Sequence, residues 1–176
     1  GVRADSTVVL YDDVAALYAA RAWWSLRVCG LETMRILDGG WTSWTRAGGE
    51  VSTATLPPPA SRYNPTLQPR LRVTTNDVRS LLGSPGVLLI DARATAEYHG
   101  FEGNTRRLGH IPGATNVPVA GLTEPGSGLF LPPDGLRDVL LRANVTRGRR
   151  ISCYDGSGVA AAKLAFLLTL AGYDEV

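Results

Sequence analysis

Short apolar runs alternate with longer apolar or amphipathic stretches along most of the chain. Five short runs, each bounded by turn-forming residues, predict strands: residues 8–11, 34–37, 87–90, 116–119 and 150–154. The longer stretches predict helices: residues 15–30, 77–82, 93–100, 133–143 and 159–171. Strands that alternate with helices imply right-handed crossovers and a mostly parallel sheet with helices on both faces. The pattern therefore predicts an α/β fold.

The chain contains an internal repeat. The strand and turn at Val8–Asp12 lead into a helix that closes at Gly30, and those at Ile151–Asp155 lead into a helix that closes at Gly172. The two units match within one residue of length. Such self-similarity indicates two copies of one strand–loop–helix unit. We expect the copies to belong to two related domains.

A Pro-rich segment separates the two units. Residues 48–70 are rich in Pro, Thr, Ser and Gly and include the stiff run Pro57–Pro59, which is typical of an interdomain linker. We assign residues 1–49 to the C-terminal part of a first domain, 50–70 to the linker and 71–176 to a second domain. The first domain is expected to be partial and the second to lack its end, so we expect the chain to be a fragment.

Composition narrows the classes of function. The 18 basic and 16 acidic residues give a formal charge of +2 without a concentrated basic face, which argues against nucleic-acid binding. No apolar stretch reaches the roughly 18 residues that span a bilayer. Cys29 and Cys153 lie in different units, so we expect free thiols, a reducing compartment and a cytoplasmic location. No cysteine pair has the spacing of a metal site.

The most informative segment is the turn at Asp155–Gly158, which lies between a predicted strand and a predicted helix. The helix that follows carries only one charge, Lys163, up to residue 171. We expect it to be buried and to direct its first free backbone N–H groups back over the turn. Such a turn can hold an anion.

Several motifs, in this order, make the chain resemble the rhodanese family over essentially its whole length. They are Leu17–Trp24, Leu37–Trp41, Asp91–Ala94, Gly109–Ala114 and Asn116–Pro118. The resemblance is to the tandem two-domain thiosulfate and 3-mercaptopyruvate sulfurtransferases. The first two motifs resemble the end of the family's inactive N-terminal domain, and the others the start of its catalytic C-terminal domain.

The resemblance implies an enzyme that needs no metal or organic cofactor. In this family a loop cysteine takes a sulfane sulfur from a small anionic donor, thiosulfate or 3-mercaptopyruvate. It holds the sulfur as a persulfide and passes it to a thiol or cyanide acceptor, and a sulfur-carrier protein is a further candidate partner. The alternative is a catalytically inactive rhodanese-like module that binds partners.

The alternative arises from the residue at the nucleophile position. Mercaptopyruvate-type loops read Cys-Gly-Ser-Gly-Val-Thr-Ala, and the matching segment here is Asp155–Ala161, so Asp155 stands where the family has its cysteine. In one interpretation Cys153 swings to the floor of the loop, where helix N–H groups lower its pKa. In a second, Asp155 fills the loop and Cys153 is a buried small hydrophobe. In a third, phosphatase-like chemistry would need an arginine at Val159, and it is absent.

The resemblance also assigns the site. Cys153 is the candidate catalytic residue. The candidate substrate-binding residues are Arg93, Asp155, Gly156, Ser157, Gly158 and Val159.

Three other predictions concern side chains outside the loop. Arg93 matches the arginine that binds the substrate's carboxylate, and the alternative for it is a surface ion pair with Asp91 or Glu97. His110 lies in a turn where we expect structural hydrogen bonding. Trp41 and Trp44 are expected to anchor the core.

Overall fold

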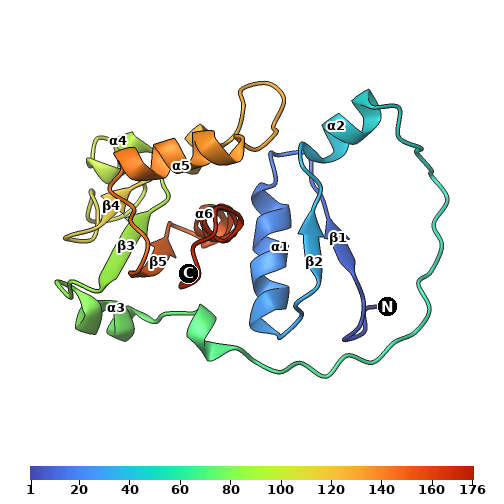
Figure 1. Ribbon diagram of the computed structural model, residues 1–176, viewed down its shortest axis with the longest axis horizontal. Coiled ribbons are helices and arrows are strands. Elements are labelled where there is room, and N and C mark those ends of the chain that lie inside the picture. Colours follow the sequence, from blue (N-terminus) through green and yellow to red (C-terminus); the bar gives the residue numbers. More distant parts are fainter.

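The strands of the computed structural model, which describes residues 1–176, form two parallel sheets. Strands β1 (Val8–Leu10) and β2 (Met34–Ile36) pair in parallel in one sheet. The other sheet has the order β4-β3-β5 and contains β3 (Val87–Asp91), β4 (Thr115–Asn116) and β5 (Arg150–Tyr154). Every pairing is parallel, as the alternation of strands and helices predicts. Figure 1 shows the two sheets on either side of a pair of helices.

The helices fall near the predicted ranges. They are α1 (Leu17–Val28), α2 (Gly40–Arg46), α3 (Thr75–Leu81), α4 (Thr95–Tyr98), α5 (Pro133–Arg142) and α6 (Val159–Leu170), with 3₁₀ turns at Pro69–Leu71 and Val119–Leu122. Between α2 and the first 3₁₀ turn the chain has no helix or strand and is almost entirely exposed. In Figure 1 this segment runs as a long loop around the outside of the first unit.

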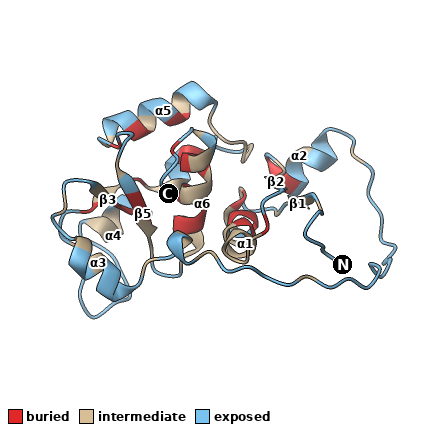
Figure 2. Ribbon diagram, turned by 60° about the horizontal axis from the view of Figure 1, so that its bottom comes forward, coloured by how far each residue is buried: buried red, intermediate tan, exposed pale blue.

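The main core lies between the three-stranded sheet and helices α5 and α6 (Figure 2). Ile90 and Ile151 from the sheet meet Leu140 of α5 and Leu164 of α6, and each is at most 3% exposed. Burying each such side chain contributes about 1.5–3 kcal/mol relative to leaving it in water. This core fixes the end of β5 and the start of α6, between which the candidate loop lies.

Helices α1 and α6 lie side by side and join the two units (Figures 1 and 2). Small residues on both helices, Ala19, Ala20 and Ala162 among them, are at most 4% exposed and let the two backbones approach closely. The Trp23 ring meets the edge of Phe166 of α6 with centroids 5.2 Å apart. The start of α6 therefore faces a helix of the first unit.

Two expectations are wrong in detail. The predicted strand at 116–119 ends at Asn116, because Pro118 has no N–H to donate and the chain turns into a 3₁₀ helix. Trp41 and Trp44 of α2 do not anchor the core, since they are 40% and 42% exposed. Trp41 packs instead against Tyr11, with ring centroids 6.4 Å apart.

Candidate functional site

The loop between β5 and α6 wraps around a carboxylate. Asp155 accepts hydrogen bonds from the Gly158 N–H at Oδ1 and from the Ala160 N–H at Oδ2, the latter at 3.0 Å. The Ser157 hydroxyl donates to Oδ2 at 3.3 Å. Gly158 has φ +81°, the left-handed conformation that turns its amide into the loop. We call residues 155–160 the cradle loop.

The first unit builds a similar arrangement around Asp12, with four backbone N–H donors instead of two. Its Oδ1 accepts hydrogen bonds from the Val14 and Ala16 N–H groups at 3.0 and 2.8 Å. Its Oδ2 accepts from the Tyr18 and Ala19 N–H groups at 2.8 and 2.9 Å. Each aspartate satisfies N–H groups at the start of the helix that follows it, which stabilises a helix N-terminus. Asp155 therefore has the place in the second unit that Asp12 has in the first, with one residue fewer between the aspartate and the helix.

Cys153 lies outside the cradle loop. It belongs to β5, is paired with Ile90 of β3, and packs partly buried against the main core. Burial raises the pKa of the Cys153 thiol to about 12, because a low-polarity environment disfavours the thiolate. The first interpretation requires helix N–H groups to lower the pKa of Cys153, whereas burial raises it here. Cys153 is only partly buried, so the choice between the first two interpretations stays a prediction.

The other loop residues shape the turn. Ser157 is exposed, and its hydroxyl lies 3.4 Å from the Val159 N–H while it donates to Asp155. Gly156 is exposed as well, with open space where a Cβ would lie. The cradle loop thus directs backbone amides and one hydroxyl at the Asp155 carboxylate, a set of donors that suits an anion.

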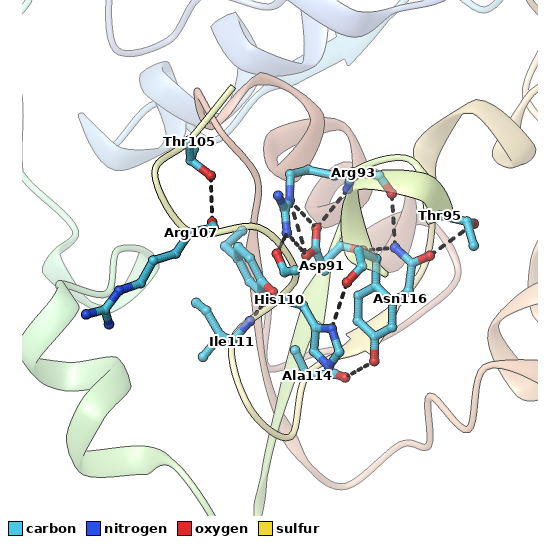
Figure 3. A network of polar contacts seen from close by, with 12 residues as sticks. Asp91, Arg93, Thr95, Thr105, Arg107, His110, Ile111, Ala114 and Asn116 are labelled. Atoms are coloured by element: carbon cyan, nitrogen blue, oxygen red, sulfur yellow. Dashed lines mark hydrogen bonds and ion pairs between the residues drawn. The ribbon is translucent and has the colours of Figure 1, made fainter. Parts of the chain in front are cut away.

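Arg93 is held by a buried aspartate (Figure 3). Its Nε donates to Asp91 Oδ1 at 3.0 Å, and its Nη2 donates to Asp91 Oδ2 at 2.6 Å and to the Gly109 carbonyl at 2.8 Å. Asp91 is 0% exposed. Burial alone would raise the pKa of Asp91, but hydrogen bonds from Arg93 hold it below its ordinary value. The ion pair with Asp91 is therefore present, although it is buried and not on the surface, and only Nη1 lacks an acceptor. A substrate-binding role for Arg93 stays a prediction.

Two residues that the sequence analysis did not single out complete this network. Asn116 donates from Nδ2 to the Asp91 and Arg93 carbonyls, each at 3.0 Å. The Tyr154 hydroxyl accepts the Ile111 N–H at 3.0 Å, and burial raises the pKa of Tyr154 to about 12. Asn116 ends β4 at the carboxyl edge of the parallel sheet, where side chains of neighbouring strands meet. The apolar pattern placed it at the start of a predicted strand, so this signal was missed.

His110 has the structural role expected of it. Its Nδ1 lies 2.8 Å from the Tyr98 carbonyl oxygen, and its ring stacks on Tyr98 with centroids 3.7 Å apart. The Tyr98 hydroxyl donates to the Ala114 carbonyl at 2.7 Å. Figure 3 shows His110 below the Asp91–Arg93 pair.

A groove of about 520 Å³ runs along the free edge of β5 beside the cradle loop. Cys153 and Asp155 line it, together with five arginines from both units, Arg21, Arg27, Arg70, Arg72 and Arg150. At one end the Ile151 N–H donates to the Glu175 carbonyl at 2.7 Å. The equivalent bond in the first unit joins Val8 to Thr33 of the connection before β2, at 3.0 Å. The groove thus lies where β2 lies in the first unit.

Neither a metal site nor a membrane span emerges from the structure. The chain has no cluster of three or more His, Cys, Asp or Glu side chains able to hold a metal ion. No helix is both long enough and apolar enough to cross a bilayer.

The Rhodanese-like domain family model matches residues 2–47 and 74–176. The chain therefore belongs to the rhodanese family. The SseB protein of Mycobacterium tuberculosis is 37% identical over 99% of this chain and 62% of its own length. The human 3-mercaptopyruvate sulfurtransferase is 31% identical over the whole chain and 61% of its own length. The rat thiosulfate sulfurtransferase is 32% identical over the whole chain and 61% of its own length. The chain thus spans about three fifths of these relatives.

Solved structures agree with this assignment. The crystal structure of SseA from Escherichia coli, one of the 3-mercaptopyruvate sulfotransferases, matches this whole chain and 66% of its own chain with TM-score 0.89 at 32% identity. EanB matches the whole chain and 47% of its own with TM-score 0.89. Its 23% identity shows the shared fold alone.

Proposed function

We propose that this protein is a sulfurtransferase that moves a sulfane sulfur from thiosulfate or 3-mercaptopyruvate to a thiol or cyanide acceptor. Its family membership and the names of its relatives support this proposal. The observation that carries it is the cradle loop, whose amides bind the Asp155 carboxylate. A loop that binds one anion at a helix N-terminus has the donors needed for an anionic sulfur donor.

Within this proposal Cys153 is the sulfur carrier, because it is the only cysteine of the second unit. Its thiolate would attack the outer sulfur of thiosulfate, so that a new S–S bond forms while the donor's own S–S bond breaks. Sulfite leaves with the electron pair. An acceptor thiolate or cyanide then attacks the outer sulfur of the persulfide, and the Cys153 thiolate is released.

The position of Cys153 sets the expected rate. A thiol with a pKa of about 12 is ionised in about one molecule in 10⁵ at pH 7. Attack on a donor in the cradle loop also requires Asp155 to leave its amides. Transfer through Cys153 should therefore be slow at neutral pH and rise about tenfold for each pH unit.

A second function, a rhodanese-like binding module that forms no persulfide, is favoured by one observation. Asp155 occupies the cradle loop and accepts hydrogen bonds from backbone N–H groups at a helix N-terminus, as Asp12 does in the first unit. A carboxylate cannot carry a sulfane sulfur. In that case the surface around the loop would bind a partner such as a sulfur-carrier protein.

Intact-mass spectrometry after incubation with thiosulfate or 3-mercaptopyruvate at pH 7 and pH 9 separates the two functions. Sulfur transfer predicts that the wild type and Cys29→Ser each gain one sulfur atom and that Cys153→Ser gains none. The gain should be about 100-fold faster at pH 9 than at pH 7. Cys29→Ser is the matched control, since it removes the chain's only other thiol. No added sulfur in any protein at either pH would overturn the enzyme proposal and leave the binding module.

A further inference from the structure

Two cationic side chains cross the α1–α6 interface from equivalent positions of the repeat. Arg21 and Lys163 are each the fifth residue of a twelve-residue helix, α1 and α6 respectively. Each helix follows the aspartate that caps it, Asp12 or Asp155. The equivalence suggests that each unit sends one cation toward the loop of the other.

Arg21 contacts the cradle loop directly. Its Nη1 donates to the Gly158 carbonyl at 3.2 Å. A Cβ built on Gly158 would lie 2.6 Å from the same nitrogen, so the guanidinium covers the loop at its left-handed residue. The Arg21 guanidinium also lies over the Trp24 ring, with its central carbon 4.8 Å from the ring centroid.

Lys163 faces the first unit. Lys163 is buried, with only 3% of the residue exposed. Burial lowers the pKa of Lys163, and the negative charge of Asp12 opposes that shift. Lys163 therefore offers a matched control for Arg21: it has the same place in its helix, but it faces the other loop.

We propose that Arg21 is a positioning residue through which the first unit holds the cradle loop of the second. By fixing the Gly158 carbonyl, it keeps the Gly158 and Ala160 amides directed at the group on residue 155, and its positive charge favours an anion there. The inference rests on the proposed function only in taking the cradle loop as the site of sulfur transfer. Residues of both units thus form the site: the second unit provides the cradle loop, and the first provides Arg21.

The first test uses amide hydrogen exchange, which needs no sulfur chemistry. In Arg21→Ala the Ala160 amide should exchange at least about tenfold faster than in the wild type, because the loop opens locally. Arg21→Lys should restore part of the protection, and Lys163→Met should leave it unchanged. Equal acceleration in Arg21→Ala and Lys163→Met, or none in either, would overturn the inference.

The second test measures the thiol pKa in Asp155→Cys from the pH dependence of alkylation. Adding Arg21→Ala should raise that pKa by about one unit, which means about tenfold less thiolate at neutral pH, whereas adding Lys163→Met should not. If the thiol pKa of Asp155→Cys is lowered but does not change when Arg21→Ala is added, the role of Arg21 is refuted and the proposed function is not. A thiol pKa that is not lowered even with Arg21 in place would refute the cradle loop as the site, and with it the proposed function.

Discussion

At the scale of single residues, the identity of residue 155 decides the chemistry of the loop. Asp155 satisfies the amides that would otherwise be free to hold a sulfur donor or to lower the pKa of a thiol. Cys153, two residues earlier, has a pKa of about 12 among apolar neighbours. Two positions along the chain thus separate the amides of the cradle loop from the Cys153 thiol.

The sequence predicted this placement only in part. The internal repeat aligned Asp155 with Asp12 and Cys153 with Leu10, and the structure agrees with that register. Which atom enters the amide ring depends on the left-handed turn at Gly158, and composition alone cannot place such a turn. The ion pair of Asp91 and Arg93 was also left open by the sequence, because an arginine at the end of a strand can bind either a ligand or a neighbouring side chain.

One residue-scale prediction concerns acid stability. Because Arg93 holds the pKa of Asp91 below its ordinary value, the stability that this pair contributes is present above about pH 4 and is lost as the pH falls through the lowered folded-state pKa. The free energy of unfolding should therefore fall with pH in this range. It can be measured by urea denaturation between about pH 2 and pH 6.

Asp91→Asn should be less stable near pH 7 and should lose much of that acid dependence. The slope that remains would come partly from Asp77, whose pKa the Thr74 hydrogen bonds also lower. If the variant kept the full wild-type slope, the Asp91–Arg93 pair would not be the source.

At the scale of elements, the start of α6 is defined by its turn and not by helix propensity. Gly158 is left-handed and lies under the Arg21 guanidinium. Gly158→Ala should destabilise the protein by about 1–2 kcal/mol, because a Cβ is strained in this conformation. Thermal or urea unfolding measures the loss.

The same substitution tests the contact with α1. In an Arg21→Ala background, Gly158→Ala should cost less than in the wild type, since the guanidinium no longer meets the added methyl group. Gly148→Ala is a useful comparison, because Gly148 is also left-handed but has open space around it. Additive effects of Arg21→Ala and Gly158→Ala would argue against close packing between the two.

Element types were predictable where apolar patterning was strong, and boundaries were not. The strand β5 and the helix α6 follow from an apolar run and an almost uncharged stretch. The predicted strand at 116–119 is shortened by Pro118, and α2 keeps its tryptophans at the surface. The length of that strand and the exposure of these tryptophans depend on which neighbouring elements cover each segment, and this cannot be predicted from a single sequence.

At the scale of the whole molecule, the two units are joined by α1 and α6 more than by the segment between them. The assigned linker, residues 50–70, remains a proposal. Most of it is exposed and has no helix or strand. The α1–α6 interface instead buries Trp23 and several alanines.

Limited proteolysis tests this arrangement. Cleavage should begin between residues 50 and 62, where the backbone is most exposed. The two pieces should nevertheless elute together in gel filtration, because α1 and α6 remain packed. Trp23→Ala, which empties the interface at its largest side chain, should allow them to separate. Separation of the wild-type pieces would show that the connecting segment holds the units together.

The central claim is that the amides of the cradle loop form the sulfur-transfer site, so that a thiol within their reach accepts a sulfane sulfur. The most direct measurement is intact-mass analysis of Asp155→Cys in a Cys153→Ser background after treatment with thiosulfate at pH 7. We predict one added sulfur atom on residue 155, and alkylation of the introduced thiol at least about 100-fold faster than that of Cys153 in the wild type. A folded variant whose introduced thiol gains no sulfur and reacts no faster than Cys153 would contradict the account.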